Sequence, residues 1–238
     1  MKLNPSSITS NSREAGFTII ESLLAVIVVG ILIVAIGPVI ALSAATRIQA
    51  RRTEWSTQAA RSYLDGLRGG AIAPPPIDGL NNPTDKKAYT DYLTGLPAPA
   101  SNTLTCNART QATLAVGDTG SGYCTAPAPG TQSAVYCVDG DNDNTCTAGS
   151  MRDFVVQAAG VQKDTGLVDN SERAKRGYLL GIRVYRADGF GDADQLKTQE
   201  PAKSFAGGLG DKKAPMLITI TEVIGSDTTY QNLQNQYQ

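Results

Sequence analysis

The chain has 238 residues, with 21 Lys and Arg against 22 Asp and Glu, four cysteines, one Trp and no histidine. Without histidine, a Ser-His-Asp or Cys-His nucleophile, a His-ligated zinc site and a histidine pH switch are excluded. The formal net charge of -1 and the lack of a long basic run argue against nucleic acid as a partner, because that binding uses many contacts of Lys and Arg with phosphates.

The N-terminal part combines a polar leader, residues 1–16, with a long apolar segment. Residues 22–46 carry no charged side chain. At about 1.5 Å per residue, a helix of this length crosses the hydrocarbon core of a bilayer, which is about 30 Å thick. A cleaved secretory signal is the alternative, but its apolar region usually has only about 7 to 15 residues. We therefore predict a transmembrane helix over residues 17–46.

Glu21 lies inside this apolar segment. An ionised carboxylate within a bilayer costs at least about 2–3 kcal/mol, so it indicates a functional contact with a partner. Cleavage after Gly16 would give Phe17 a positively charged amino group, and the amine of a neighbouring subunit would neutralise Glu21. Pro38 lacks an N–H group and predicts a weak point or kink in the helix, with or without a role in assembly.

The sequence Gly-Phe-Thr-Ile-Ile-Glu at residues 16–21 resembles the N-terminal motif of the type IV pilin and pseudopilin family. Members carry a leader that ends in Gly, followed by Phe-Thr-Leu-Ile/Val-Glu at the start of a long apolar helix. In this chain Ile19 replaces the usual Leu. Pro38 lies where many pilins have a kinking proline. The resemblance implies that a prepilin peptidase cuts between Gly16 and Phe17 and methylates the new amine.

The resemblance also implies a function and a location. The protein would be a minor pilin or pseudopilin, joined with other pilins or pseudopilins in a type IV pilus-like or type II secretion-like filament that an assembly ATPase on other chains drives. It would be a single-pass inner-membrane protein with a periplasmic or extracellular C-terminal domain before it enters the filament. Residues 136–139, 153–158 and 177–186 resemble cyanobacterial pseudopilins of hormogonium polysaccharide secretion, which implies a role in polysaccharide secretion and gliding motility.

The distribution of basic residues argues against a C-terminal domain outside the cytoplasm. More basic residues follow the apolar segment than precede it, so the positive-inside rule alone would place the C-terminal domain in the cytoplasm. The leader motif and the cysteines favour a C-terminal domain outside the cytoplasm.

Residues 47–70 continue the helix beyond the membrane. One face is apolar and is formed by Ile48, Trp55, Ala59, Tyr63 and Leu67. We expect this face to pack on a sheet and the pair Gly69-Gly70 to end the helix. The opposite face is charged and is available to neighbouring subunits; it holds Arg51, Glu54, Arg61 and Asp65.

Residues 71–238 are predicted to form an external, disulfide-containing β domain. Residues 71–130 are rich in Pro, Gly, Asn and Thr, which favours an irregular connection with one short helix at 85–93. Alternating or apolar runs predict four strands, at residues 134–138, 154–158, 178–185 and 216–224. The predicted fold class is α+β, a pilin-like arrangement of a long N-terminal membrane-spanning helix packed on a mainly antiparallel sheet.

Four cysteines lie in this domain: Cys106, Cys124, Cys137 and Cys146. Their even number and the absence of a CxxC spacing favour two disulfides over a zinc or redox site, whereas four free thiols would suit a cytosolic protein. Three pairings are open. The one that closes the shortest loops joins Cys106 to Cys124 and Cys137 to Cys146.

Asp139, Asp141 and Asp143 stand at alternating positions, as at the start of a calcium loop. Positions 144 and 150 lack the Gly and Glu of an EF-hand, so calcium would need a ligand from elsewhere, such as Asp153. The alternative is an ordinary acidic turn between strands. A second acidic turn, with weaker spacing, spans residues 187–194.

No GxSxG, SxxK or Walker A motif occurs, so we expect no enzymatic activity and no catalytic residue. No cofactor is expected beyond the candidate calcium ion. The second functional hypothesis is a calcium-dependent adhesin or binding module on a membrane tether.

Overall fold

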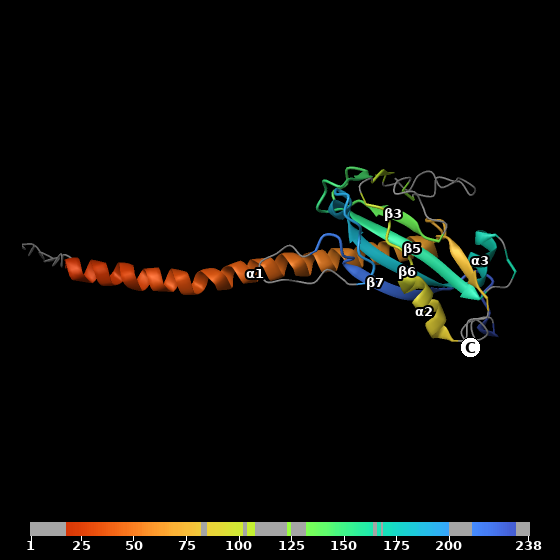
Figure 1. Ribbon diagram of the computed structural model, residues 1–238, viewed down its shortest axis with the longest axis horizontal. Helices are drawn as coiled ribbons and strands as arrows, with labels where there is room; N and C mark the ends of the chain where they lie inside the picture. Colours follow the sequence, from red (N-terminus) through yellow and green to blue (C-terminus); the bar gives the residue numbers. More distant parts are fainter. Residues whose placement is uncertain are drawn as a thin grey trace, which may run out of the picture. The chain divides into compact units, whose positions relative to one another are not determined.

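The structure is a computed structural model that describes residues 18–81, 85–101, 104–107, 123–124, 132–163, 166–167, 169–199 and 211–231. The chain divides into two compact units, Met1–Ala44 and Ala45–Gln238. Helix α1, Ile19–Arg68, begins in the first unit and ends in the second. The second unit holds a mixed sheet, so the fold class is α+β (Figure 1).

The start of α1 is capped by Thr18. The backbone N–H of Glu21 donates to the Thr18 hydroxyl at 3.3 Å and to its carbonyl at 3.0 Å. The spacing Thr-x-x-Glu is that of a capping box, in which a hydroxyl and a carboxylate satisfy N–H groups of the first helical turn. Pro38 lies inside α1, and the helix continues on both sides of it.

The part of α1 in the second unit packs on the sheet with a face that differs from the predicted one. Ala59 and Tyr63 are buried as expected, but Ile48 and Trp55 are 45% and 40% exposed. Arg52 and Ser56 are buried instead. The apolar periodicity missed these two residues because both are polar: the Ser56 hydroxyl donates to a carbonyl one turn earlier, and the Arg52 guanidinium contacts the Met151 sulfur.

Among the described residues, the main sheet has five strands, and the four predicted ones are all present. They are β3 (Ala134–Val138), β5 (Phe154–Lys163), β6 (Tyr178–Arg186) and β7 (Leu217–Val223). Strand β5 is five residues longer than predicted, which lets it pair antiparallel with β3 and β6 and also parallel with β1 (Ile77–Leu80). The parallel pair makes the sheet mixed. A short second sheet joins β2 (Cys106–Asn107) and β4 (Thr145–Cys146).

Strand β1 is held by α3 (Asn170–Arg176), and neither element was predicted. The Asn170 side chain accepts from the N–H of Ile77 at 2.8 Å and donates to the Pro75 carbonyl at 2.9 Å. Arg173 donates to the Ile77 carbonyl at 2.5 Å. These bonds from outside the sheet fix a four-residue strand that contains Asp and Gly, both poor strand formers.

Both faces of the sheet are covered. Leu180, Ile182 and Val184 of β6 belong to the core cluster that contains Ala59 and Tyr63 of α1. The other face carries helix α2 (Lys86–Gly95), which begins at the capping residue Asp85 close to its predicted position. The alternating sequence of β6 therefore does not leave one face exposed, because this second layer covers it. Every residue of β6 is buried except Gly181, which is partly buried.

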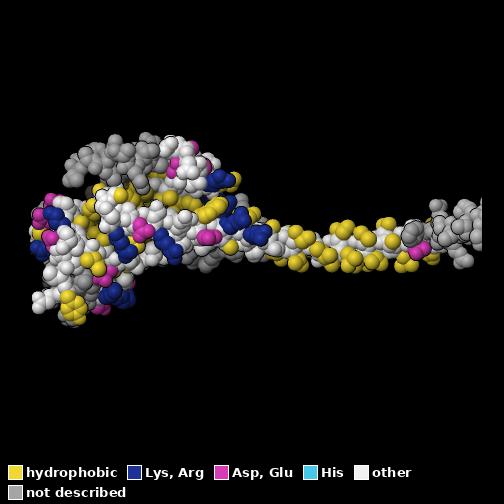
Figure 2. Space-filling view, turned by 180° about the vertical axis from the view of Figure 1, so that it is seen from behind, with side chains coloured by type: hydrophobic (Ala, Val, Ile, Leu, Met, Phe, Trp, Pro, Cys, Tyr) yellow, Lys and Arg dark blue, Asp and Glu magenta, His cyan; other side chains and the backbone are white. Residues whose placement is uncertain are grey.

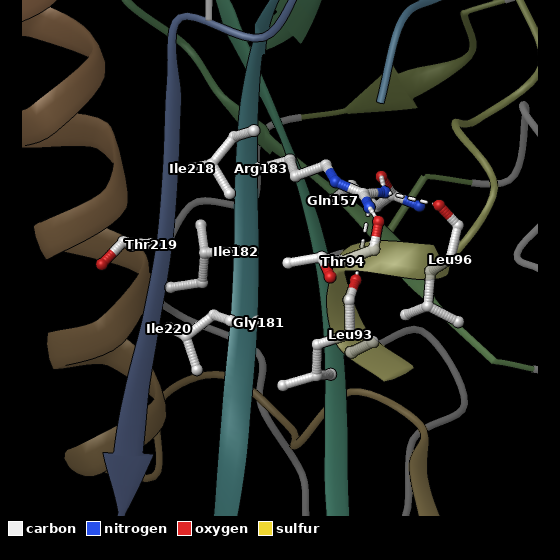
Figure 3. Close-up of a pocket in the computed structure, with 11 residues that line it drawn as sticks. Leu93, Thr94, Leu96, Gln157, Gly181, Ile182, Arg183, Ile218, Thr219 and Ile220 are labelled. Atoms are coloured by element: carbon white, nitrogen blue, oxygen red, sulfur yellow. Dashed lines mark hydrogen bonds between the residues drawn. The ribbon is translucent and has the colours of Figure 1, made fainter. Parts of the chain in front are cut away.

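Arg183 joins α2 to the sheet (Figure 3). Its side chain is buried and donates to the carbonyls of Leu96 at 2.8 Å, Thr94 at 2.6 Å and Leu93 at 3.3 Å. It also donates to Gln157 Oε1 at 3.1 Å. Burial lowers the pKa of Arg183 below its ordinary value, but a guanidinium remains protonated in proteins. The cation thus satisfies carbonyls at the C-terminal end of α2, where the helix dipole is negative.

Candidate functional site

Two parts of the molecule carry candidate functional residues, one in each unit. In the first unit, α1 is mostly apolar, and Glu21 is the one charged side chain among residues 18–44. Every large apolar side chain from Ile19 to Leu42 is at least 44% exposed. Figure 2 shows these hydrophobic side chains along the helix. Within the described ranges, α1 is the one helix long and apolar enough to cross a membrane.

Glu21 lies in the first turn of α1. A carboxylate in this position interacts favourably with the positive end of the helix dipole and completes the Thr18 capping-box sequence. A local role in starting the helix therefore exists beside the predicted role in binding a neighbouring amine. The predicted cleavage residues, Gly16 and Phe17, lie outside the described residues.

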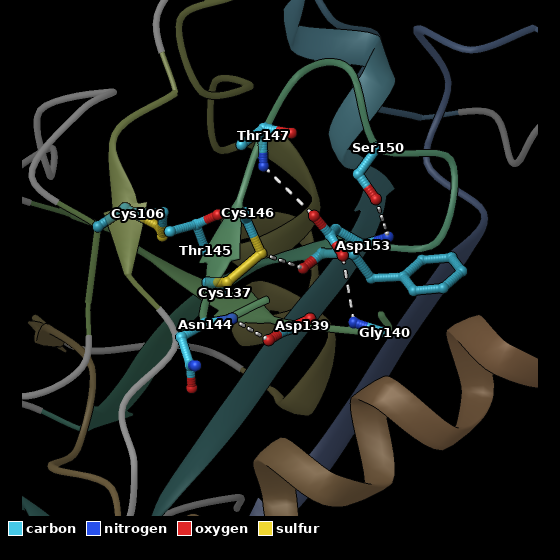
Figure 4. The surroundings of a disulfide bond; sticks show 12 residues. Cys106, Cys137, Asp139, Gly140, Asn144, Thr145, Cys146, Thr147, Ser150 and Asp153 are labelled. Carbon is cyan, nitrogen blue, oxygen red and sulfur yellow. Dashed lines mark hydrogen bonds between the residues drawn. A yellow bond between two sulfur atoms is a disulfide. The ribbon is translucent and has the colours of Figure 1, made fainter. Parts of the chain in front are cut away.

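In the second unit, the disulfides hold an acidic loop. The structure pairs Cys106 with Cys124 and Cys137 with Cys146, the pairing favoured from loop length. The second bridge spans the ends of β3 and β4, and residues 139–144 connect these strands (Figure 4). All four cysteines are buried.

Asp139 organises the loop through backbone hydrogen bonds. Its carboxylate accepts from the N–H groups of Asp141 at 3.0 Å, Asn142 at 2.6 Å and Asn144 at 2.7 Å. Asn142 and Asn144 adopt left-handed backbone angles, with φ of 62° and 68°, which Asn tolerates better than most residues. Burial acts to raise the pKa of Asp139, but the three N–H donors outweigh it and lower the pKa below its ordinary value.

The acidic residues that converge differ from the predicted set. Asp139, Asp141 and Asp153 each place a carboxylate oxygen within 4.8 Å of the others. Asp143 does not join them, because its carboxylate accepts from the backbone N–H and the hydroxyl of Thr145, both at 2.8 Å. From the sequence, Asp153 could be named only as a possible ligand from outside the loop. Its position beside Asp139 and Asp141 depends on the fold.

Asp153 is 1% exposed. Its carboxylate accepts from the N–H groups of Gly140 at 3.2 Å and Thr147 at 3.3 Å, while Asp141 accepts from the Ser150 hydroxyl at 3.0 Å. Burial raises the pKa of Asp153 above its ordinary value, against the effect of these N–H donors. The hydrogen bonds account for the loop conformation without an ion, and the closeness of three carboxylates is the feature that a cation would stabilise.

The second acidic turn is occupied by ion pairs. Asp188 pairs with Arg186, and Asp192 pairs with Lys212. The Lys213 ammonium donates to the carbonyls of Gly189 at 2.8 Å and Asp192 at 3.0 Å. Basic side chains thus pair with two of the three carboxylates of this turn, which gives these two a structural role.

Comparisons with models of protein families, with curated proteins and with solved structures found no match to this chain.

Proposed function

We propose that this chain is a minor pilin or pseudopilin that is processed by a prepilin peptidase and assembled into a type IV pilus-like or type II secretion-like filament. The observation that carries the proposal is the start of α1: Thr18 caps a helix whose first turn holds Glu21 and whose following residues, up to 46, are uncharged and almost all exposed. Processing after Gly16 would place the new amine of Phe17 directly before this cap.

The exposed apolar part of α1 needs a nonaqueous surrounding. Lipid satisfies it in the membrane, and the same surface can be covered by equivalent helices when subunits assemble, because both environments exclude water from apolar side chains. Glu21 gives this otherwise uniform surface a point of recognition. A neighbouring amine that neutralises Glu21 fixes the register of two helices, since an unpaired carboxylate there is costly.

The second unit is consistent with an external location. Two disulfides persist in an oxidising compartment and are rare in the cytosol. We include the narrower role in polysaccharide secretion and gliding motility in the proposal because of the local sequence resemblance. The three resembling segments overlap β5 and β6, which lie inside the sheet, and β3, which pairs with β5.

The test compares Glu21→Gln with Glu21→Ala in cells that carry only the variant chain. Gln keeps the neutral capping-box partner and removes the charge, whereas Ala removes both. Loss of a pairing worth about 3 kcal/mol reduces incorporation into sheared filaments about 100-fold. We expect this reduction for both variants, with a mature N-terminus at Phe17 in mass spectrometry, and none for the control Glu172→Gln, which removes an exposed carboxylate from the first turn of α3.

Normal incorporation of Glu21→Gln would show that the charge has no pairing role. A mature N-terminus near residue 44 would instead indicate a secreted soluble protein, and an intact leader would indicate a plain membrane tether. Either of these N-termini would refute the pilin proposal itself.

A calcium-dependent binding module on a membrane tether is the second candidate. The convergence of Asp139, Asp141 and Asp153 favours it. Calcium that binds only the folded state raises the melting temperature. The measurement is the melting temperature with CaCl2 against MgCl2, and the rise with CaCl2 should disappear in Asp141→Asn. The same melting temperature with CaCl2, with MgCl2 and without an added divalent cation excludes this candidate.

A further inference from the structure

A groove of about 460 Å³ lies beside the acidic loop, in the second unit. One wall is α1, with Trp55, Gln58 and Ser62 along one side of the helix; the other wall is formed by residues 138–140 and by Arg152. Figure 4 shows α1 passing near the loop that carries Asp139 and Gly140. The volume falls within the range of about 300–1,000 Å³ that is usual for small-molecule sites.

The groove combines an aromatic surface with unused polar groups. Trp55 is the only Trp of the chain and is 40% exposed, although it lies in a part of α1 that packs on the domain. Among the residues that the structure describes, the side chains of Gln58, Ser62 and Arg152 have no hydrogen bond or ion pair. Three polar side chains of one groove thus keep their full capacity to donate or accept.

Asp139 adds an acceptor to the groove. A carboxylate has about four lone-pair sites, and the three N–H groups of the loop occupy two at Oδ1 and one at Oδ2. The backbone N–H groups of the loop therefore leave one site at Oδ2, on a carboxylate that the Asp141 side chain also approaches. Among the side chains that line the groove, the formal charges of Asp139 and Arg152 cancel, while the carboxylates of Asp141 and Asp153 lie close to Asp139. The groove therefore does not favour a polyanion.

We propose that this groove is a saccharide-binding site. A sugar ring has an apolar face of C–H groups, which packs on an indole, and a rim of hydroxyl groups, each of which donates and accepts a hydrogen bond. The indole supplies a large, rigid, partly apolar contact surface, and the amide, hydroxyl, guanidinium and carboxylate around it match the rim. This inference goes beyond filament assembly and does not depend on processing of the leader.

The test uses the purified full chain in a detergent without a sugar headgroup. It is screened on an array of defined neutral and uronic-acid oligosaccharides, and hits are titrated by the fluorescence of Trp55, which has no background from other Trp residues. We expect a saturable change in emission. By calorimetry, Trp55→Ala and Arg152→Ala should each weaken binding about tenfold or more, as for central contact residues. Arg61→Ala, on the same helix but outside the groove, should change affinity less than about twofold.

Three results would overturn the proposal. One is that no oligosaccharide on the array binds. Another is that binding persists unchanged in both Trp55→Ala and Arg152→Ala. The third is that phosphatidylglycerol vesicles alone shift the emission of Trp55 while saccharides do not, which would assign the indole to a membrane surface. Thermal melts establish that each variant is folded, and Arg152, being exposed, tests the site even if the Trp55 variant is unstable.

Discussion

Arg183→Met tests whether one buried cation attaches α2 to the sheet. The substitution keeps much of the aliphatic volume and removes the four hydrogen bonds that the guanidinium donates. Three carbonyls at the end of α2 then lose their partner, and so does Gln157 Oε1. The groups lie in a region where water does not easily replace the guanidinium, since Arg183 is 5% exposed.

The expected loss follows from these contacts. Hydrogen bonds to a charged group each contribute about 1.5–3 kcal/mol, which for four bonds would give at least about 6 kcal/mol. The variant no longer has to bury a cation, and this gain offsets part of the sum. Breaking a buried charged network typically costs about 3–5 kcal/mol. We therefore expect the free energy of unfolding to fall by about 3 kcal/mol. With a urea m-value of about 2 kcal/mol/M, the midpoint falls by about 1.5 M.

The assay is urea unfolding of the detergent-solubilised full chain, followed by far-UV circular dichroism and by tryptophan emission. The control is Arg176→Met, because Arg176 is exposed at the end of α3 and loses the same charge. Its midpoint should stay within about 0.3 M of the wild type, as for ordinary surface substitutions. If Arg183→Met shifts the midpoint no more than this control, the hydrogen bonds do not stabilise the attachment of α2.

Two further predictions concern the acidic loop. Replacing Cys137 and Cys146 together by Ser should lower the free energy of unfolding by about 3 kcal/mol in the chain-entropy estimate for a short loop; urea unfolding measures this, and a loss below about 1 kcal/mol would contradict it. N–H donors lower the pKa of Asp139 in the folded state. The carboxylate therefore stabilises the fold fully above the pKa of the unfolded state, about 3.9, and this contribution is lost as pH falls through the pKa of the folded state. Melting temperatures between about pH 6 and pH 2.5 should therefore fall less steeply in Asp139→Asn, and identical slopes would rule the contribution out. The raised pKa of Asp153 acts in the opposite direction, so the comparison between variant and wild type is needed.

Strands and helices with a clear local signal could be predicted. Strand β3 has the predicted bounds, and α2 and β7 differ from prediction by one or two residues. Strand β1 and helix α3 could not be predicted, because β1 is short and its stability comes from Asn170 and Arg173, which are distant in the sequence. The acidic cluster was predicted in part: Asp139 and Asp141 were expected in it and Asp153 was named as a ligand from elsewhere in the chain, whereas Asp143 does not join it.

The apolar helix and the even set of cysteines are predictable from the order of amino acids alone, because each depends on composition or on spacing within a few residues. Capping of the helix by Thr18 was not predicted. The buried face of α1, the cover on both faces of β6 and the polar groups that line the groove at Trp55 depend on tertiary packing. Burial of Arg52 and Arg183 depends on partners far away along the chain, and hydrophobic periodicity contains no information about such partners. The fold brings these partners together, and their hydrogen bonds and contacts allow the polar residues to be buried.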